Sequence, residues 1–285
     1  MTSIYGASQR GTSHMHYGVP NQDAISYLTM YDFDVMMVLD GVSLNTKGEF
    51  SKSHLASHFV KREAIKFLKA GAKKGMSIKD LERVIKLCFI YVSKRLEIFV
   101  KAYGDKYHES TNINDYQTTF TLLIHKKGKF AYGNAGDAGI IYLNDKGDIN
   151  FITNSIKANT FGSFVEPLCV KESWQFGTYE ERPVTFILMA TDGIFDALIP
   201  NKHSQYINYN LLNRFIDKDI INGRNKDHKL KKVLVKLDKR VTGDDKSVVI
   251  LRNQTVKLFK EETLDDIKER EKAYIQALNK LLSQM

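Results

Sequence analysis

Five aspartates of this chain share one property: each stands where a short apolar run begins or ends, or in the turn between two such runs. They are Asp23, Asp40, Asp137, Asp192 and Asp244. A short apolar run bounded by turn residues predicts a buried strand, and the end of a strand holds a side chain at a fixed place. Carboxylates crowded at one edge of a sheet repel one another and raise their own pKa values, and bound cations relieve that repulsion.

The residue types also select the cation and its chemistry. Carboxylate oxygens with few histidines suit Mg²⁺ or Mn²⁺. Two such ions about 3.5–4 Å apart can activate a water molecule and hold a phosphoryl group. Taken singly, an Asp-Gly pair after a strand, as at Asp40 and Asp192, is more often a plain turn. The prediction of a two-ion hydrolytic site therefore depends on whether the fold brings these carboxylates together.

The composition is that of an ordinary water-soluble protein. With 285 residues, 43% hydrophobic and 26% charged, the chain is long enough for one large domain or two small ones. It has no apolar run of the roughly 20 residues that cross a bilayer, and its first residues lack the apolar segment of a signal peptide. We therefore expect a cytoplasmic protein with no membrane contact, in which Cys88 and Cys169 are buried thiols and not a disulfide.

The net charge of +9 comes mostly from lysine. Such a charge can mark a surface that binds nucleic acid or a membrane. No basic stripe interleaved with aromatic residues accompanies it. A solvated lysine-rich surface is therefore the favoured interpretation, and a nucleic-acid partner is not expected.

The first half of the chain predicts a hairpin followed by two helices. Residues 25–29 alternate between apolar and polar and residues 35–39 are continuously apolar, which is typical of two antiparallel strands. This hairpin places Asp23 and Asp40 at the same end of a sheet. A helical period then covers residues 51–102 with a break near a glycine. Three stretches without a period are predicted to be loop or irregular: GTSHMHYGVPNQDA, residues 104–115 and residues 154–182.

The second half predicts more antiparallel strands. Four runs separated by short turns predict a four-stranded meander over residues 117–124, 130–134, 139–143 and 149–153. Asp137 lies in the turn between its second and third strands. The run 184–190 ends at Asp192 and the run 248–251 follows Asp244, so antiparallel pairing of these two strands would bring the two aspartates together.

Two further segments carry a helical period. Residues 203–240 predict helices interrupted near Gly223, and residues 261–282 predict an amphipathic helix. We expect this last helix to pack on the domain. A contact with a partner protein or a second copy of the chain is the alternative.

Six stretches of the sequence resemble, in order and spacing, the metal-dependent serine/threonine phosphatases of the PPM type, also called the protein phosphatase 2C group, with the bacterial branch closest. They are GTSHMHYGVPNQDA, VMMVLDGVS, DYQTTFTLL, AYGNAGDAG, FILMATDGIFDAL and TGDDKSVVIL. The resemblance implies an α+β fold, a four-layer α-β-β-α sandwich of two antiparallel sheets flanked by helices. We expect a phosphatase domain over residues 1–253 and a helical extension over residues 254–285.

The same resemblance implies a role for each strand-end aspartate. By position, Asp40 would bridge two ions of Mn²⁺ or Mg²⁺, with the backbone carbonyl of Gly41 on one of them. Asp192 and Asp244 would complete the shell of the other ion, and Asp137 would join Asp192 in a weaker third site. Catalysis would centre on Asp40 and Asp192. The implied reaction is attack of a metal-activated water on phosphoserine or phosphothreonine of a signalling protein substrate, without a phosphoenzyme.

The sequence lacks the histidine that the family uses as its proposed general acid. Many members have Asp-Gly-His-Gly-Gly, where this chain has DGVSL. His14 and His16 lie in the preceding loop and are the candidates for binding phosphate. His14 is the candidate for donating a proton, although a histidine in a loop often has no special role.

Other departures concern the residues that assist the ions. Asp23 would hold metal-bound water, and Gln22 stands where the family has an acidic residue with a similar function. Gly18 stands where many members have a phosphate-binding arginine. Asp245 replaces the usual asparagine, and Asp244 is the predicted ligand of that pair.

Three functions fit these residues to different degrees. The retained aspartates favour an active phosphoprotein phosphatase. The missing histidine, arginine and acidic residue would fit a catalytically weak or inactive binding module with the same fold. A two-metal nuclease would fit the carboxylates and the positive charge, but the order of the motifs argues against it.

Overall fold

The structure of the chain is a computed structural model. The structure describes residues 3–42, 51–153, 166–199, 207–216, 225–237 and 243–252, together with residues 269 and 272. The predicted helical break near Gly223 lies outside the described residues, as do residues 43–50 and the predicted C-terminal helix apart from residues 269 and 272.

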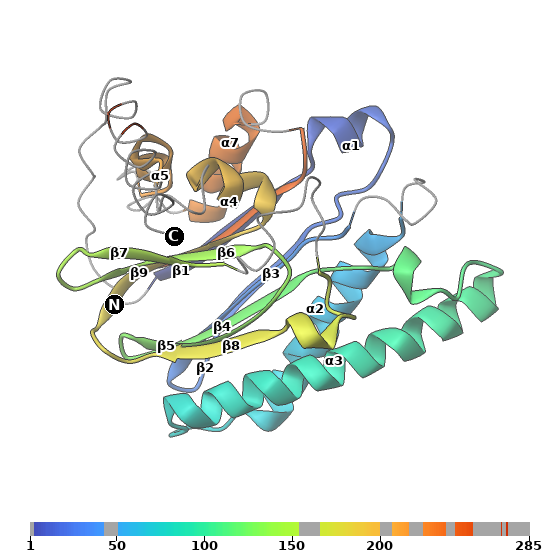
Figure 1. The fold of residues 1–285 in the computed structure, drawn as a ribbon, viewed down its shortest axis with the longest axis horizontal. Coiled ribbons are helices and arrows are strands. Elements are labelled where there is room, and N and C mark those ends of the chain that lie inside the picture. Colours follow the sequence, from blue (N-terminus) through green and yellow to red (C-terminus); the bar gives the residue numbers. More distant parts are fainter. Residues whose placement is uncertain are drawn as a thin grey trace, which may run out of the picture.

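Ten strands form two antiparallel five-stranded sheets (Figure 1). The first sheet has the order β1-β10-β9-β6-β7, and its strands are β1 (Ser3–Gln9), β10 (Lys246–Arg252), β9 (Val184–Ala190), β6 (Gly139–Asn144) and β7 (Ile149–Ile152). The second sheet has the order β2-β3-β4-β5-β8, and its strands are β2 (Ala24–Met30), β3 (Phe33–Leu39), β4 (Phe120–Lys126), β5 (Lys129–Ala135) and β8 (Gln175–Tyr179).

Helices cover the outer face of each sheet, as Figure 1 shows. The second sheet is covered by α2 (Ser53–Gly71) and α3 (Ile78–Tyr107), and the first by α4 (Asp192–Leu198), α5 (Tyr209–Phe215) and α7 (Lys226–Leu237). A short helix, α1 (Thr12–His16), precedes β2. This is the four-layer α+β sandwich that the sequence predicted. None of the helices in the described part of the chain has the length and apolar content to cross a bilayer.

The continuous apolar runs are strands buried on both faces. In β3, Val35, Met37 and Leu39 belong to the core beneath α2 and α3, while Met36 and Val38 belong to the core between the sheets. Successive side chains of a strand point to opposite faces, so a strand in the middle of four layers has no polar side. β9 follows the same rule between the inter-sheet core and the core under α4, α5 and α7.

The predicted four-stranded meander is wrong in one respect. β4 pairs with β5 and β6 pairs with β7, but β5 and β6 lie in different sheets, with β8 and β9 as their other neighbours. Between them the chain crosses from one sheet to the other at residues 136–138, where Gly136 has φ +113°, a conformation that suits glycine. The alternation of side chains is the same for either arrangement. The crossing places Asp137 at the end of the sandwich, between its two sheets.

Three boundaries also differ from the prediction. The loop GTSHMHYGVPNQDA contains the helix α1, and the irregular stretch 154–182 contains the edge strand β8. Helix α3 extends to Tyr107 and therefore includes the first residues of the predicted loop 104–115. Short elements such as α1 and β8 carry too few residues to show a period. Cys88 and Cys169 are free thiols, as expected, but only Cys88 is buried and Cys169 is half-buried.

Candidate active site

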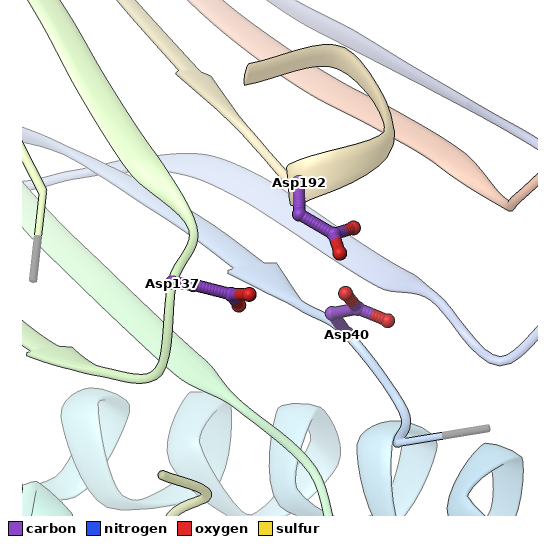
Figure 2. Close-up of side chains that lie close together, drawn as sticks. All are labelled: Asp40, Asp137 and Asp192. Carbon is purple, nitrogen blue, oxygen red and sulfur yellow. The ribbon is translucent and has the colours of Figure 1, made fainter. Parts of the chain in front are cut away.

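Three of the predicted aspartates meet at one end of the sandwich (Figure 2). One carboxylate oxygen from each of Asp40, Asp137 and Asp192 lies within 4.8 Å of the other two, and all three side chains are half-buried. They come from the end of β3, the crossing between β5 and β6, and the start of α4 after β9. Both sheets therefore contribute to this group, which we call the acidic cluster.

The backbone of Asp40 is fixed by the two residues that precede the neighbouring strand β4. The amide of Asp40 donates to Thr119 Oγ1 over 2.8 Å, and its carbonyl accepts from the amide of Thr119 over 2.7 Å and from Thr118 Oγ1 over 2.9 Å. At the next residue, a Cβ added to Gly41 would lie 2.6 Å from Ser53 Oγ and 2.9 Å from Gln22 Cβ. Only glycine fits there, so the first turn of α2 can approach the end of β3 closely.

Thr191 connects the Asp192 strand to its neighbours. Its hydroxyl donates to Asp23 Oδ2 over 2.9 Å and accepts from the amide of Ser247 over 3.1 Å. Asp23 is buried, with 2% of its surface exposed. One threonine therefore links β9, the start of β2 and β10 beside the acidic cluster. Sequence reasoning missed Thr191 and Thr119, and the only available signal was that each lies next to a strand end.

Burial and mutual repulsion raise the pKa values of these carboxyl groups. Burial, followed by the charges of Asp192, Asp23 and Asp137, raises the pKa of Asp40 well above its usual range. Burial, followed by the charges of Asp137 and Asp244, raises the pKa of Asp192 to about 7. Burial, followed by the charge of Asp245, raises the pKa of Asp23 to about 8. The cluster is therefore a place where added positive charge is strongly stabilised.

The cluster fits a hard divalent cation. Its donors are carboxylate oxygens on separate rigid elements, close enough together to share ions. Mg²⁺ and Mn²⁺ prefer such oxygen ligands and retain water in their remaining positions. Asp244 is near enough to contribute to the raised pKa values of Asp40 and Asp192, and its side chain is 42% exposed. The carboxylates of Asp40, Asp137 and Asp192 thus provide a donor set suited to such an ion, with Asp244 close by.

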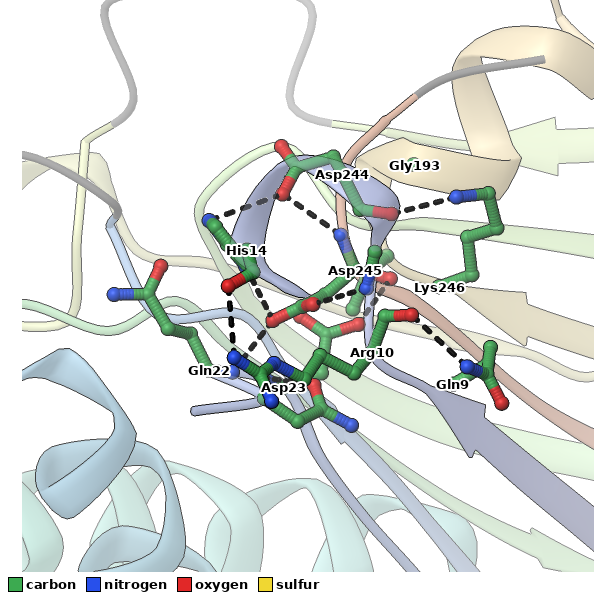
Figure 3. Close-up of polar contacts among 12 residues, drawn as sticks. Gln9, Arg10, His14, Gln22, Asp23, Gly193, Asp244, Asp245 and Lys246 are labelled. Atoms are coloured by element: carbon green, nitrogen blue, oxygen red, sulfur yellow. Dashed lines mark hydrogen bonds and ion pairs between the residues drawn. The ribbon is translucent and has the colours of Figure 1, made fainter. Parts of the chain in front are cut away.

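The adjacent residues Asp244 and Asp245 have different environments (Figure 3). Asp245 is 1% exposed, and it accepts from the amide of Gly11 over 2.7 Å and from the amide of Gln22 over 2.5 Å. His14 Nδ1 lies 2.9 Å from its Oδ2. All of these groups belong to the segment between β1 and β2. Asp245 therefore fastens that segment to the start of β10, and Asp244 is the member of the pair that remains half-exposed.

The two candidate histidines occupy different environments. His14 is 4% exposed, and its two ring nitrogens face Asp245 and Asp244, with Nε2 3.8 Å from Asp244 Oδ1. A hydrogen bond with Asp245 raises the pKa of His14, and this effect outweighs the opposing effect of burial. His16, two residues further along α1, is exposed and meets the ring of Tyr17 edge-on at 4.9 Å.

Gln22 is fully buried beside Gly41. Its backbone is held by Asp245 at the amide and by Ser57 Oγ at the carbonyl, over 2.6 Å. Neither atom of its side-chain amide has a hydrogen-bond partner among the residues that the structure describes. A buried amide without a partner is costly, so this group is suited to bind a water molecule or another ligand next to the end of β3.

The family model that matches this chain is described as protein phosphatase 2C and covers residues 10–235. The chain therefore belongs to the protein phosphatase 2C family, as its motifs predicted. A search of the curated proteins gives no match. Most of the proposed phosphatase domain and the whole acidic cluster fall within the matched residues.

Solved structures of bacterial phosphatases share the fold. The serine/threonine phosphatase Stp1 from Staphylococcus aureus has a TM-score of 0.59 at 14% identity, with 89% of this chain and 96% of that chain covered. The Mycobacterium tuberculosis phosphatase PstP/Ppp has a TM-score of 0.58 at 15% identity, with coverage of 89% and 99%. The catalytic domain of PstP in complex with two manganese ions has a TM-score of 0.54 at 16% identity, with coverage of 88% and 97%. At these identities the likeness concerns the fold.

Proposed function

We propose that the protein is a metal-dependent phosphoprotein phosphatase that hydrolyses phosphoserine and phosphothreonine. The observation that carries the proposal is the acidic cluster, in which Asp40, Asp137 and Asp192 from two sheets converge within 4.8 Å. Membership of the protein phosphatase 2C family, whose members act on phosphoproteins, supports the reaction class. The raised pKa values of Asp40 and Asp192 support a site that is completed by cations.

Each aspartate has a proposed position around two ions. Asp40 would contact both ions, and the carbonyl of Gly41 would face one of them. Asp192 and Asp244 would hold the second ion, and Asp137 would join Asp192 at a weaker third position. Asp23 and Gln22 would orient water molecules that are bound to the ions. Asp23 is fixed for this role by the hydroxyl of Thr191 at 2.9 Å.

Manganese or magnesium is the proposed cofactor. A structural neighbour, the catalytic domain of PstP, carries two manganese ions, and the oxygen donors here suit either metal. Bound ions of this kind supply an activated water and neutralise the charge of a phosphoryl group. The protein's own contribution is to hold the carboxylates rigidly, through Thr118 and Thr119 at Asp40 and through the backbone of Gly193, whose amide donates to Asp192 Oδ1 over 2.6 Å.

The proposal is tested by turnover of p-nitrophenyl phosphate and of a phosphothreonine peptide by the purified protein with Mn²⁺. We expect hydrolysis that EDTA abolishes and that Asp40→Asn removes. Asp34→Asn is the matched control, because Asp34 is a buried carboxylate on the same strand at its opposite end. Hydrolysis that persists in EDTA or in Asp40→Asn would contradict the proposed mechanism.

A binding module with the same fold is the second candidate. One reason is that Gln22 is neutral where the family has an acidic residue. The other is that each ring nitrogen of His14 faces a carboxylate and is therefore not directed at a substrate. The two candidates differ in turnover. Tight binding of Mn²⁺ and of a phosphopeptide, with no phosphate released under any metal condition, would favour the binding module.

A further inference from the structure

Asp244 is held from three directions. Its carbonyl accepts from Lys246 Nζ over 2.6 Å, its Oδ1 accepts from the amide of Asp245 over 2.8 Å, and the same Oδ1 lies 3.8 Å from His14 Nε2. Lys246 is fully buried. Asp245 and Lys246 follow Asp244 directly in the sequence. His14, in contrast, belongs to a distant segment, the helix α1.

His14 is itself fixed by a buried carboxylate. Its Nδ1 lies 2.9 Å from Oδ2 of Asp245, which also accepts from the amide of Gln22. The other oxygen of Asp245 accepts from the amide of Gly11. An asparagine has one acceptor oxygen and could not serve both sets of donors. An aspartate at position 245 can therefore accept from His14 and from both backbone amides, which an asparagine could not do.

We propose that Asp245 and His14 form a positioning pair, in which Asp245 orients the imidazole and the imidazole holds the carboxylate of Asp244 toward the acidic cluster. The inference rests on the proposed function, because it takes Asp244 as a metal ligand. Groups behind a metal ligand orient it, and losing one typically costs about 10–100-fold in metal affinity. The pair assigns His14 a place behind the metal site, in contrast to the phosphate-binding and proton-donating roles that the sequence suggested.

The geometry separates this role from a direct contact with substrate. The His14 side chain is 5% exposed and each of its ring nitrogens faces a carboxylate. A residue that binds phosphate or protonates a leaving group needs a nitrogen directed at the substrate. His16 lies on the same helix, is exposed, and forms no hydrogen bond or ion pair with Asp244 or Asp245 in the described part of the chain. It is therefore a matched control.

The test is Mn²⁺ binding measured by calorimetry without substrate, together with the melting temperature in EDTA. For His14→Ala we expect one class of Mn²⁺ site to weaken by about 10–100-fold, and for His16→Ala no change. An unchanged Mn²⁺ affinity in His14→Ala, with or without a loss of turnover, would overturn the positioning role. A wild-type protein that neither binds Mn²⁺ nor hydrolyses a phosphate ester would overturn the proposed function and this inference together.

Two conservative variants keep the proposal testable if His14→Ala does not fold. His14→Asn places an amide nitrogen near the position of Nδ1 and keeps the contact with Asp245. His14→Gln places one near the position of Nε2 and keeps the contact with Asp244. We expect His14→Gln to retain more Mn²⁺ affinity and His14→Asn to retain more thermal stability. A role in stability alone predicts equal Mn²⁺ affinities for both variants.

Coupling between the two residues completes the test. Because Asp245 acts on Asp244 through His14, His14→Ala combined with Asp245→Asn should weaken Mn²⁺ binding no more than the stronger of the two single changes. Residues that act independently give additive losses. Additive losses in Mn²⁺ affinity would therefore contradict the pair.

Discussion

Strand β3 has an aspartate near each end, and the two aspartates lie in opposite electrostatic environments. Asp34 lies at the start of the strand, where His125 on the neighbouring strand β4 is its register partner. Its Oδ2 lies 3.4 Å from His125 Nδ1 and its Oδ1 accepts from Thr29 Oγ1 over 2.6 Å. Asp40 follows the end of the same strand, where the nearby groups are other carboxylates.

The pKa values show the contrast. Burial raises the pKa of Asp34, but hydrogen bonds from His125 and Thr29 outweigh it, and the net pKa is lowered. The pKa of Asp40 is raised well above its usual range, by burial and then by the charges of Asp192, Asp23 and Asp137. One end of the strand neutralises its charge with groups of the protein, and the other end concentrates charge that an added cation would balance. We infer that the first end serves stability and the second serves function.

The largest expected effect comes from removing a charge at the functional end. Asp192→Asn should lower metal-dependent turnover by more than about 100-fold, the upper range for residues that merely support a ligand. The same change should raise the melting temperature in EDTA, because it relieves repulsion with Asp137 and Asp244 while the asparagine oxygen can still accept from the amide of Gly193. Kinetics with Mn²⁺ and thermal unfolding in EDTA measure both. A lower melting temperature would show that the cluster is not under electrostatic strain.

The pH dependence of stability should have opposite signs at the two ends. Asp192 and Asp23 have pKa values raised from 3.8 to about 7 and about 8. Between the unperturbed pKa and these raised pKa values, the folded protein therefore binds more protons than the unfolded chain. Stability is lost as the pH rises through that window. Asp34, with its lowered pKa, adds stability that is lost as the pH falls through its folded value. Melting temperatures in EDTA from about pH 5 to pH 9 should decline, and saturating Mn²⁺ should remove the decline. A flat profile in EDTA would contradict the raised pKa values.

A smaller effect is expected at the structural end. Asp34→Asn places an amide nitrogen opposite His125 Nδ1. The other ring nitrogen of His125, Nε2, already accepts from the amide of Gly128 over 3.0 Å. A buried donor that faces another donor costs about 1–3 kcal/mol. Urea unfolding should show this loss, while turnover per folded molecule stays at the wild-type level. A fall in turnover without loss of stability would mean that the two ends of β3 are coupled.

The sequence predicted the parts of the site that depend on strand direction. The hairpin placed Asp23 and Asp40 together, and the register confirms it, with Ala24 opposite Leu39. The antiparallel pairing of β9 with β10 was also correct. These predictions hold because a buried strand has a recognisable run and a short turn fixes the direction of the next strand.

The sequence could not predict what depends on contacts between distant segments. The crossing at Gly136 is invisible to periodicity, although it decides which end of the sandwich receives Asp137. The hydroxyl of Thr191 meets Asp23, which is 168 residues away. Asp245 and His14 meet across an even longer separation. Polar residues next to strand ends carry no pattern of their own, so their partners emerge only from the packed fold.

The smallest effect in this comparison is expected at Asp137, the member of the acidic cluster that comes from the crossing between the sheets. Asp137→Ala leaves Asp40, Asp192 and Asp244 in place, so turnover at saturating Mn²⁺ should fall by less than about 10-fold, the lower limit for loss of a supporting group. The Mn²⁺ concentration that gives half-maximal activity should rise, because the cluster loses one of its negative charges. A titration of activity with Mn²⁺ separates the two quantities. A loss as large as that of Asp192→Asn would place Asp137 among the principal ligands, and the functional end of β3 would then depend equally on all three strand-end carboxylates.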